Sequence, residues 1–269
     1  METNTLPAID AHAHVFVRGL PLAPQRRYAP DYDAPLEQYL EHLDRHGLSH
    51  GLLVQPSFLG EDNAYLVAML ARAPARLRGI AVVGKDVGPE ALQGLGEAGI
   101  VGVRLNLIGE ALPDIDTPEW TPLVEALLER AWSVEIQRTS ADVAILAHQL
   151  VDAGLEVVLD HFALPVDEDD PGFARVLALG ASRRTWVKLS APYRGGPYGK
   201  QRAVRAYPRL RDAFGFDRLM WGSDWPHTGF ERSETFAGNR RFLDALAPSA
   251  VERDQILAAP RDLFRLTSD

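Results

Sequence analysis

Short apolar runs rich in β-branched residues recur along the chain, and amphipathic segments separate them. The runs have the length of strands, and their spacing gives eight of them. The predicted strands are Ala8–His14, Gly51–Gln55, Leu77–Val83, Gly102–Asn106, Ser133–Gln137, Glu156–Asp160, Thr185–Ser190 and Leu219–Gly222. The predicted helices are Leu36–His46, Asp62–Ala73, Pro89–Ala98, Pro118–Arg130, Ala141–Ala153, Gly172–Leu179 and Arg202–Phe214. Because strands and helices alternate strictly, the pattern predicts parallel strands joined by right-handed crossovers.

Eight such repeats in 269 residues match the size of a single (β/α)8 (TIM) barrel, an α/β fold. We therefore predict one barrel domain over residues 1–269. A doubly wound open sheet is the structural alternative. No Gly-x-Gly-x-x-Gly motif follows a predicted strand, which counts against the dinucleotide-binding form of that alternative.

The composition narrows the class of protein. Hydrophobic residues make up 46% of the chain and charged residues 24%, as in an ordinary globular protein. There is no cysteine, which excludes disulfides, a thiol nucleophile and cysteine-ligated metals. No apolar run reaches the roughly 18 residues that span a bilayer, and the first residues lack the features of a signal peptide. We expect a cytoplasmic protein with no membrane partner.

The net charge is −9, from 37 acidic and 28 basic residues, so the overall field repels polyanions. Nucleic acid is therefore not an expected partner. Single arginines can still bind a small anion inside a pocket. The sequence carries no signal for the oligomeric state.

Polar side chains collect at the carboxyl ends of the predicted strands, where a barrel of this type forms its active site. They are His12, His14, Gln55, Ser57, Arg104, Asn106, Gln137, Arg138, Asp160, His161, Lys188, Ser190, Tyr193, Arg194, Ser223, Asp224 and His227. Apolar strands that end so uniformly in reactive or ligand-binding side chains indicate an enzyme with a small-molecule site.

The stretch Asp10-Ala-His-Ala-His14 places His12 and His14 on one face of the first strand, because strand side chains alternate. Two converging imidazoles can hold a divalent metal or donate hydrogen bonds to a substrate oxygen. Taken alone, the pair is equally consistent with hydrogen-bonded core residues. The polar set around it favours a catalytic role.

Asp224, in Met-Trp-Gly-Ser-Asp-Trp-Pro-His, follows the eighth strand and is a candidate general base for water. Its alternative role is that of a turn or helix-cap residue. His161 ends the sixth strand and is a candidate donor to a carbonyl oxygen or a proton relay, or else a structural histidine fixed by Asp160. Arg104 and Arg194 are candidates for a substrate carboxylate, and ion pairs that support the barrel are their alternative.

At these residues the chain resembles the amidohydrolase superfamily, in particular its amidohydrolase-2 branch of pyrone-dicarboxylate and sugar-lactone hydrolases. The matching pieces occur in family order over nearly the whole chain. They are Ile9-Asp-Ala-His-Ala-His14-Val-Phe, Arg27-Tyr, Val54-Gln-Pro-Ser57, Gly102-Val-Arg-Leu-Asn106, Val158-Leu-Asp-His161-Phe, Val187-Lys-Leu-Ser190 and Trp221-Gly-Ser-Asp-Trp-Pro-His227.

The resemblance implies that Asp224 deprotonates or orients the attacking water, while His12, His14 and His161 surround the scissile carbonyl. Metal-dependent relatives hold a divalent ion, such as zinc or manganese, through residues matching His12, His14 and Asp224 and a histidine on strand five. This chain has Gln137 in that region, and an amide is a poor ligand for a transition metal. We therefore favour a metal-independent site with no cofactor, in which His12 and His14 donate to the carbonyl oxygen. A divalent metal held by His12, His14 and Asp224 is the alternative.

A second departure concerns the substrate, because Leu107-Ile-Gly-Glu110 lacks the further arginine that the dicarboxylate hydrolases carry after the position of Arg104. A monocarboxylated lactone and a sugar lactone bound by Gln55, Asn106 and Gln137 both stay open. Further predicted substrate-binding residues are Ser57, Tyr193 and His227. The predicted function is a hydrolase that opens a lactone; a lactone isomerase, a metal-dependent decarboxylase and a non-catalytic binding barrel are the alternatives.

Overall fold

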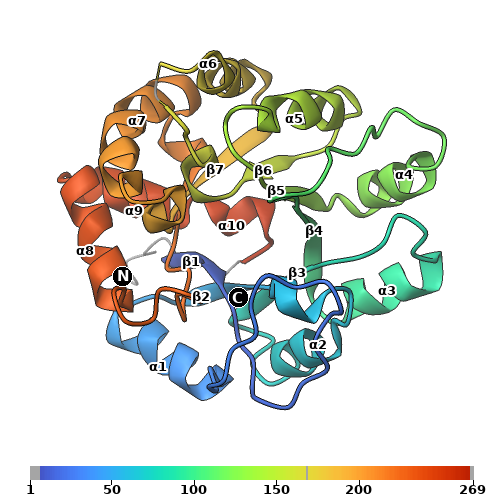
Figure 1. The fold of residues 1–269 in the computed structure, drawn as a ribbon. Coiled ribbons are helices and arrows are strands. Elements are labelled where there is room, and N and C mark those ends of the chain that lie inside the picture. The colour runs from blue at the N-terminus through green and yellow to red at the C-terminus, as the bar shows by residue number, and fades with distance from the viewer. Residues whose placement is uncertain (1–6, 168, 267–269) are drawn as a thin grey trace, which may run out of the picture.

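The computed structural model describes residues 7–167 and 169–266, which form one ring of strands surrounded by helices (Figure 1). The strands are β1 (Ile9–Ala13), β2 (His50–Val54), β3 (Leu77–Ala81), β4 (Ile100–Asn106), β5 (Ser133–Gln137), β6 (Val157–Leu159), β7 (Thr185–Ser190) and β8 (Leu219–Gly222). They pair in parallel in the order β1 to β8. The predicted (β/α)8 barrel is confirmed; residues 1–6, 168 and 267–269 of the predicted domain lie outside the described residues.

The helices cover the outside of the ring. They are α1 (Leu36–Arg45), α2 (Ala64–Leu70), α3 (Pro89–Glu97), α4 (Thr121–Arg130), α5 (Val143–Asp152), α6 (Pro171–Ala178), α7 (Gly199–Phe214), α8 (Phe236–Leu246), α9 (Ala250–Ala258) and α10 (Pro260–Leu263). Short 3-10 helices are η1 (Ser57–Leu59), η2 (His161–Ala163), η3 (Leu179–Ser182), η4 (Pro192–Gly195) and η5 (Phe216–Arg218). The sequence prediction contained no helix after the eighth strand, so α8, α9 and α10 are additions. No helix of the described chain is long and apolar enough to cross a membrane.

The barrel closes between β1 and β8 through a few specific contacts. The backbone N–H of Asp224 donates to the carbonyl of His12 (2.8 Å), and the N–H of His14 donates to the carbonyl of Trp225 (2.7 Å). The buried carboxylate of Asp10 accepts from Ser223 N (2.8 Å) and Ser223 Oγ (2.6 Å). A Cβ atom at Gly222 would lie 2.6 Å from Cβ of His12, so only glycine allows this approach. The seam thereby brings His12 and Asp224 together.

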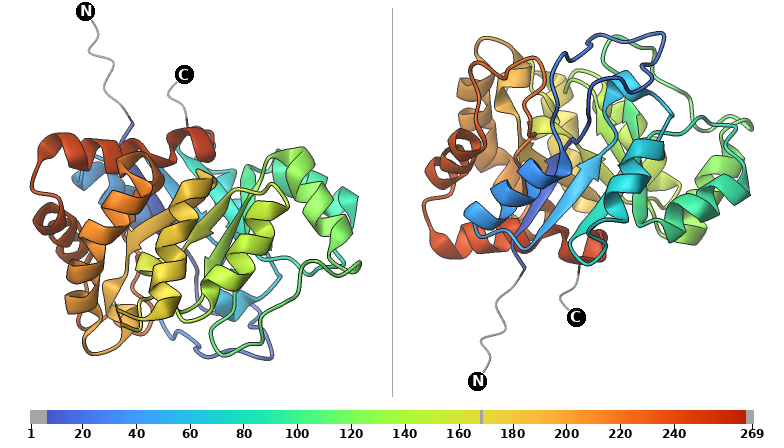
Figure 2. Two further views of the ribbon diagram at one scale, coloured as in Figure 1. Left: turned by 90° about the horizontal axis from the view of Figure 1, so that it is seen from above. Right: turned by 90° about the horizontal axis from the view of Figure 1, so that it is seen from below.

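The interior of the barrel has two layers. One is a cluster of buried apolar side chains that extends to Phe264 and Leu266 at the amino-terminal end of the barrel: Ile9, Ala11, Leu52, Val54, Ile80, Val101, Val158, Trp186, Met220, Phe264 and Leu266. Helices α9 and α10 lie at this end, and the long loop between β1 and α1 lies at the other end (Figure 2). The carboxyl ends of the strands therefore open toward the loops, as the position of an active site in this fold requires.

Candidate active site

A cavity of about 280 Å³ opens among the loops at the carboxyl ends of the strands. It is lined by His14, Arg27, Tyr28, Pro56, Ser57, Phe58, Arg104, Asn106, Ile108, Gln137, His161, Leu164, Arg194, Asp224, Thr228 and Phe230. The lining combines aromatic and aliphatic walls with converging polar groups, as is usual for a small-molecule site.

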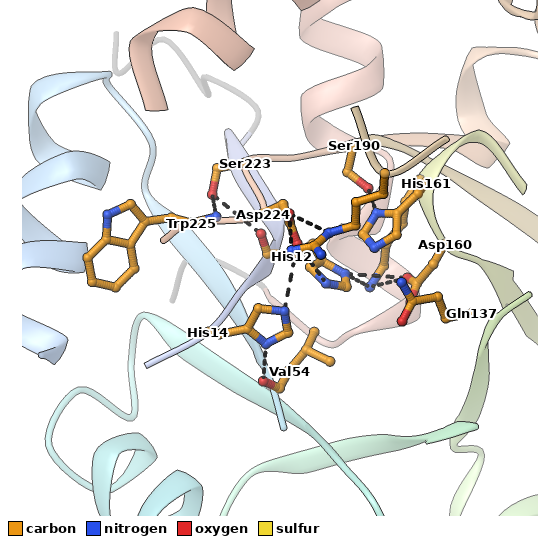
Figure 3. Close-up of polar contacts among 12 residues, drawn as sticks. His12, His14, Val54, Gln137, Asp160, His161, Ser190, Ser223, Asp224 and Trp225 are labelled. Atoms are coloured by element: carbon orange, nitrogen blue, oxygen red, sulfur yellow. Dashed lines mark hydrogen bonds and ion pairs between the residues drawn. The ribbon is translucent and has the colours of Figure 1, made fainter. Parts of the chain in front are cut away.

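The two histidines of the first strand face the same carboxylate oxygen of Asp224 (Figure 3). Nε2 of His12 is 3.6 Å and Nε2 of His14 is 3.7 Å from Oδ1 of Asp224. These separations exceed a direct hydrogen bond. Within the described residues, His12 Nε2 and Asp224 Oδ1 are buried and have no hydrogen-bond partner. Buried polar atoms that converge without pairing indicate that a small molecule completes the cluster.

The ring of His14 presents a lone pair to this cluster. Its Nδ1 lies 2.7 Å from the carbonyl oxygen of Val54, so Nδ1 carries the proton and donates it (Figure 3). Burial lowers the pKa of His14, which favours the neutral ring. In that state Nε2 has no proton and is an acceptor. This departs from the interpretation of the sequence in which His14 donates to a carbonyl oxygen, because the tautomer is set by a backbone carbonyl of the neighbouring strand.

His12 has the opposite arrangement. The Nζ atom of Lys188, which can only donate, lies 3.1 Å from Nδ1 of His12. Asp160 Oδ1 also lies 3.3 Å from this Nδ1 but has no hydrogen-bond partner within the described residues. When Nδ1 accepts from Lys188, the proton of the neutral ring lies on Nε2 and faces the cluster. Burial, followed by the charge of Lys188, holds the pKa of His12 well below its ordinary value, so the ring stays neutral.

A network of buried charged side chains lies next to His12. Lys188 donates to Glu135 (2.6 Å), and Arg104 donates through Nε (2.9 Å) and Nη2 (2.8 Å) to one oxygen of Asp160. Burial would raise the pKa of Asp160, but Arg104 and Lys188 outweigh it and hold that pKa well below its usual range. Burial raises the pKa of Glu135 to about 7. The network fixes the positions of His12 and Arg104.

His161 is the first residue of η2, and its backbone φ of 54° lies in the left-handed region. This conformation turns the ring back toward His12, with ring centroids 4.9 Å apart. Nδ1 lies 2.8 Å from Oγ of Ser190 (Figure 3), while Nε2 is buried and unpaired within the described chain. Burial lowers the pKa of His161 to about 3, so the ring is neutral.

Asp224 also has a left-handed backbone, with φ of 56°. Its Oδ2 accepts from Tyr193 Oη (2.7 Å), Arg194 Nε (2.8 Å) and Arg194 Nη2 (2.7 Å), which leaves Oδ1 for the cluster. Burial would raise the pKa of Asp224, but the charge of Arg194 holds it well below its usual range. Asp224 is therefore a buried, ionised acceptor with one oxygen free.

The structure places most of the predicted site residues at one cavity. His14, Ser57, Arg104, Asn106, Gln137, His161, Arg194 and Asp224 line it, whereas His12, Tyr193 and His227 lie behind this lining. Gln55 is outside it, because its Nε2 donates to the carbonyls of Gly60 (3.1 Å) and Asp62 (2.8 Å) and holds the loop after β2. Both predicted anion-binding arginines form the ion pairs named as their alternative, and both also face the cavity.

Sequence reasoning did not assign several residues of the site. Glu135 was not singled out, because one acidic residue in a short strand carries no pattern of its own. Arg27 and Tyr28 were noted in the loop after the first strand but were given no role. The signal that could have found Arg27 was its place in the matching piece Arg27-Tyr. Phe58 and Phe230 supply walls that only the loop conformations reveal.

The fit of a divalent metal is mixed. One ligand atom each from His12, His14 and Asp224 lie within 4.8 Å of one another, so these three residues could hold an ion. The strand-five position offers no further free ligand, because Oε1 of Gln137 accepts from Arg104 Nη2 (3.0 Å). Arg194 already neutralises the single carboxylate of the set. Two histidines and one carboxylate are a ligand set that catalytic zinc sites use, so the residues present could hold an ion, whereas the pairing of Asp224 with Arg194 disfavours one.

The sequence profile of the amidohydrolase family matches residues 9–266. The chain is 30% identical to a 2-pyrone-4,6-dicarboxylate hydrolase of Comamonas testosteroni, over 93% of this chain and 87% of that protein. It is 28% identical to a 4-sulfomuconolactone hydrolase of Hydrogenophaga intermedia, over 95% of this chain and 88% of that protein. A solved structure from Pseudomonas putida, named as a candidate 2-pyrone-4,6-dicarboxylic acid hydrolase, superposes with a TM-score of 0.91. It is 45% identical and covers 98% of this chain and 99% of its own. The chain therefore belongs to the amidohydrolase-2 family, among relatives that hydrolyse lactones.

Proposed function

We propose that this protein hydrolyses the ring ester of a small lactone with water activated by Asp224, without a metal. The observation that carries the proposal is the convergence of Asp224 Oδ1, His12 Nε2 and His14 Nε2 at separations of 3.6 and 3.7 Å from the carboxylate oxygen. A water molecule between these atoms would satisfy groups that are otherwise buried without partners.

Two acceptors and one donor surround that water position. Asp224 Oδ1 and the lone pair of His14 Nε2 each accept a hydrogen of the water, which turns an oxygen lone pair toward the cavity. Asp224 then receives the proton as the water oxygen attacks. Tyr193 and Arg194 hold the carboxylate by its other oxygen. Their contacts keep Asp224 ionised and oriented.

Two imidazoles are placed to stabilise the developing negative charge. The Nε2–H of His12, set by the bond from Lys188, and the unpaired Nε2 of His161 face the same region. If Ser190 donates its hydroxyl hydrogen to Nδ1 of His161, Nε2 carries the proton and donates to the carbonyl oxygen. The water oxygen bonds to the carbonyl carbon, the ring C–O bond breaks, and Asp224 returns the proton to the departing oxygen. The product is an open-chain hydroxy acid.

Metal independence rests on the donor set. His12, His14 and Asp224 would hold a divalent ion, and a bound ion would polarise the carbonyl or lower the pKa of water. The engaged amide of Gln137 and the ion pair of Arg194 with Asp224 disfavour that state. A lactone carbonyl is more reactive toward water than an amide carbonyl, so its hydrolysis requires less stabilisation from the site.

The names of the relatives support a lactone substrate. Two of them are hydrolases of a pyrone dicarboxylate and of a sulfomuconolactone, and both substrates are cyclic esters with anionic substituents. For this chain we propose a carboxylated or sugar-acid lactone. Ser57, Asn106 and Gln137 are the proposed contacts for its polar groups. A cytoplasmic location is proposed from the sequence alone.

A panel of sugar-acid lactones, muconolactones and pyrone carboxylates tests the proposal, with and without a chelator. We expect at least one lactone to be opened to its hydroxy acid at a rate that the chelator leaves unchanged, by protein that contains less than stoichiometric metal. Stoichiometric zinc or manganese required for turnover would contradict metal independence. Formation of an isomeric lactone instead of the acid would contradict hydrolysis.

A further inference from the structure

Arg27 brings a third guanidinium to the cavity from outside the barrel. It lies in the long loop between β1 and α1, and its Nη2 donates to Oδ1 of Asn106 at the end of β4 (3.0 Å). Arg27, Ser57, Asn106 and Ile108 line the cavity and also a second hollow next to it. Arg27 is therefore at the outer end of the cavity, whereas Asp224 is fully buried at its inner end.

The three arginines of the lining differ in their partners. Arg104 is paired with Asp160 (2.8 Å) and Arg194 with Asp224 (2.7 Å). Over residues 7–167 and 169–266, no carboxylate lies within ion-pair distance of Arg27. Its pKa is lowered by burial and then by the charges of Arg104 and Arg194, while Glu110 acts in the opposite direction. A positive charge without a paired anion, at the end of a small-molecule cavity, is suited to an anionic group of a ligand.

The loop that carries Arg27 is held in place on both sides. The backbone N–H of Ala23 donates to the carbonyl of Phe58 (2.8 Å). The hydroxyls of Tyr28 and Tyr32 both donate to Oε1 of Glu231, at 2.7 and 2.8 Å, in the segment between β8 and α8. These contacts position Arg27 over the cavity before a ligand arrives, which lowers the entropy cost of binding.

We propose that Arg27 is a specificity-determining residue that binds an anionic substituent of the lactone, a carboxylate or a sulfonate, at the outer end of the cavity. The inference rests on the proposed function, since it places the ring carbonyl at Asp224 and the anionic substituent away from it. Arg104 and Arg194 keep their carboxylate partners, so Arg27 supplies the free charge that selects an anionic lactone over a neutral one.

The test compares Arg27→Ala with Arg26→Ala, using one anionic lactone and one neutral lactone of the same ring size that the wild-type protein hydrolyses. Arg26 is a matched control, because it is the adjacent arginine of the same loop, donates to the carbonyl of Ala23 (2.9 Å) and does not line the cavity. We expect Arg27→Ala to lower kcat/KM for the anionic lactone about 10- to 100-fold, mainly through KM. For the neutral lactone, kcat/KM should change less than about twofold.

Arg27→Lys should restore part of the preference, because it keeps the charge but loses the planar pair of donors. Equal losses for both lactones, or equal losses in Arg26→Ala and Arg27→Ala, would overturn the inference. A wild-type protein with equal kcat/KM for the neutral and the anionic lactone would overturn it too, while leaving the proposed hydrolysis intact. Wild-type protein that opens no lactone would instead refute the proposed function. Thermal unfolding of each variant shows that the fold is kept.

Discussion

The two layers inside the barrel are built from the same strands but have opposite character. In the apolar layer, Ile80, Val158 and Met220 are fully buried among apolar neighbours. In the polar layer, Glu135 and Lys188 are just as buried but are charged. The apolar layer gains free energy from burial, whereas the polar layer has a desolvation cost that its ion pairs only partly offset.

Several unpaired buried atoms lie together in the polar layer. Within the described chain, buried atoms without hydrogen-bond partners include His12 Nε2, Asp160 Oδ1, His161 Nε2 and Asp224 Oδ1. Leaving a buried polar atom unpaired costs on the order of 1–3 kcal/mol. A cluster of such atoms beside a cavity indicates that stability has been given up for ligand binding. The comparison therefore assigns stability mainly to one layer and chemistry to the other.

The largest expected effect is on the chemistry of the polar layer. Replacing Asp224→Asn removes the charge that accepts the proton of water but keeps the shape and one acceptor oxygen. We expect kcat to fall by about 10²- to 10⁴-fold, with the circular dichroism spectrum unchanged. Steady-state kinetics on the lactone found in the panel checks this. Turnover within a few-fold of wild type would refute the role of Asp224 as the base.

Breaking the charge network should affect stability and chemistry together. Lys188→Met leaves Glu135 and Nδ1 of His12 without their donor. Removal of one partner of a buried ion pair costs about 3–5 kcal/mol of unfolding free energy, which urea denaturation measures. The double variant Lys188→Met with Glu135→Gln should recover part of that stability, because Glu135 no longer brings an unpaired charge. A double variant no more stable than Lys188→Met would show that the pair is not coupled.

The apolar layer should respond in stability alone. Met220 is fully buried on β8, two residues before the end of the strand. Met220→Ala leaves a cavity and should lower the unfolding free energy by about 2–5 kcal/mol. At a temperature where the variant stays folded, kcat should match the wild-type value. A large fall in kcat of the folded variant would mean that the two layers do not act separately.

The smallest expected effect is that of pH. The pKa of Asp224 is held well below its usual range and the pKa of His14 is lowered, so Asp224 stays ionised and His14 neutral at and above pH 6.5, and the pKa of His161 is about 3. As pH falls, kcat/KM should therefore stay within about twofold down to about pH 5 and decline only at lower pH. Glu135, with its pKa of about 7, and Asp10, with its pKa raised by burial to about 6, are groups that titrate in this range. A loss of activity near pH 6.5 that persists in Glu135→Gln would contradict the neutral histidines.

The sequence predicts the barrel well because its short strands are buried on both faces and stand out as apolar runs. β5, β7 and β8 have the predicted limits, and the other strands differ by one or two residues at one or both ends. The polar side chains at the carboxyl ends of the strands also identify the cavity. α9 was missed because the segment Ala250–Ala258 mixes charged and apolar residues without a clear apolar stripe.

What the sequence does not predict depends on partners far along the chain. The tautomer of His14 is set by the carbonyl of Val54 on the next strand. Gln55 turns to the loop after β2, although its position at a strand end suggested a ligand contact. The place of Arg27 depends on how Glu231, 204 residues later in the numbering, anchors the loop through Tyr28. Such contacts follow from the closed ring rather than from local pattern.

The central claim is that a water held by Asp224 and His14 attacks the ring carbonyl. Mass spectrometry of the product formed in ¹⁸O-labelled water under single-turnover conditions tests it most directly. We expect one ¹⁸O atom in the new carboxylate of the hydroxy acid and none in the new hydroxyl. The variant Asp224→Asn should form no labelled product. Label in the hydroxyl, or an unlabelled isomeric lactone as the product, would contradict it.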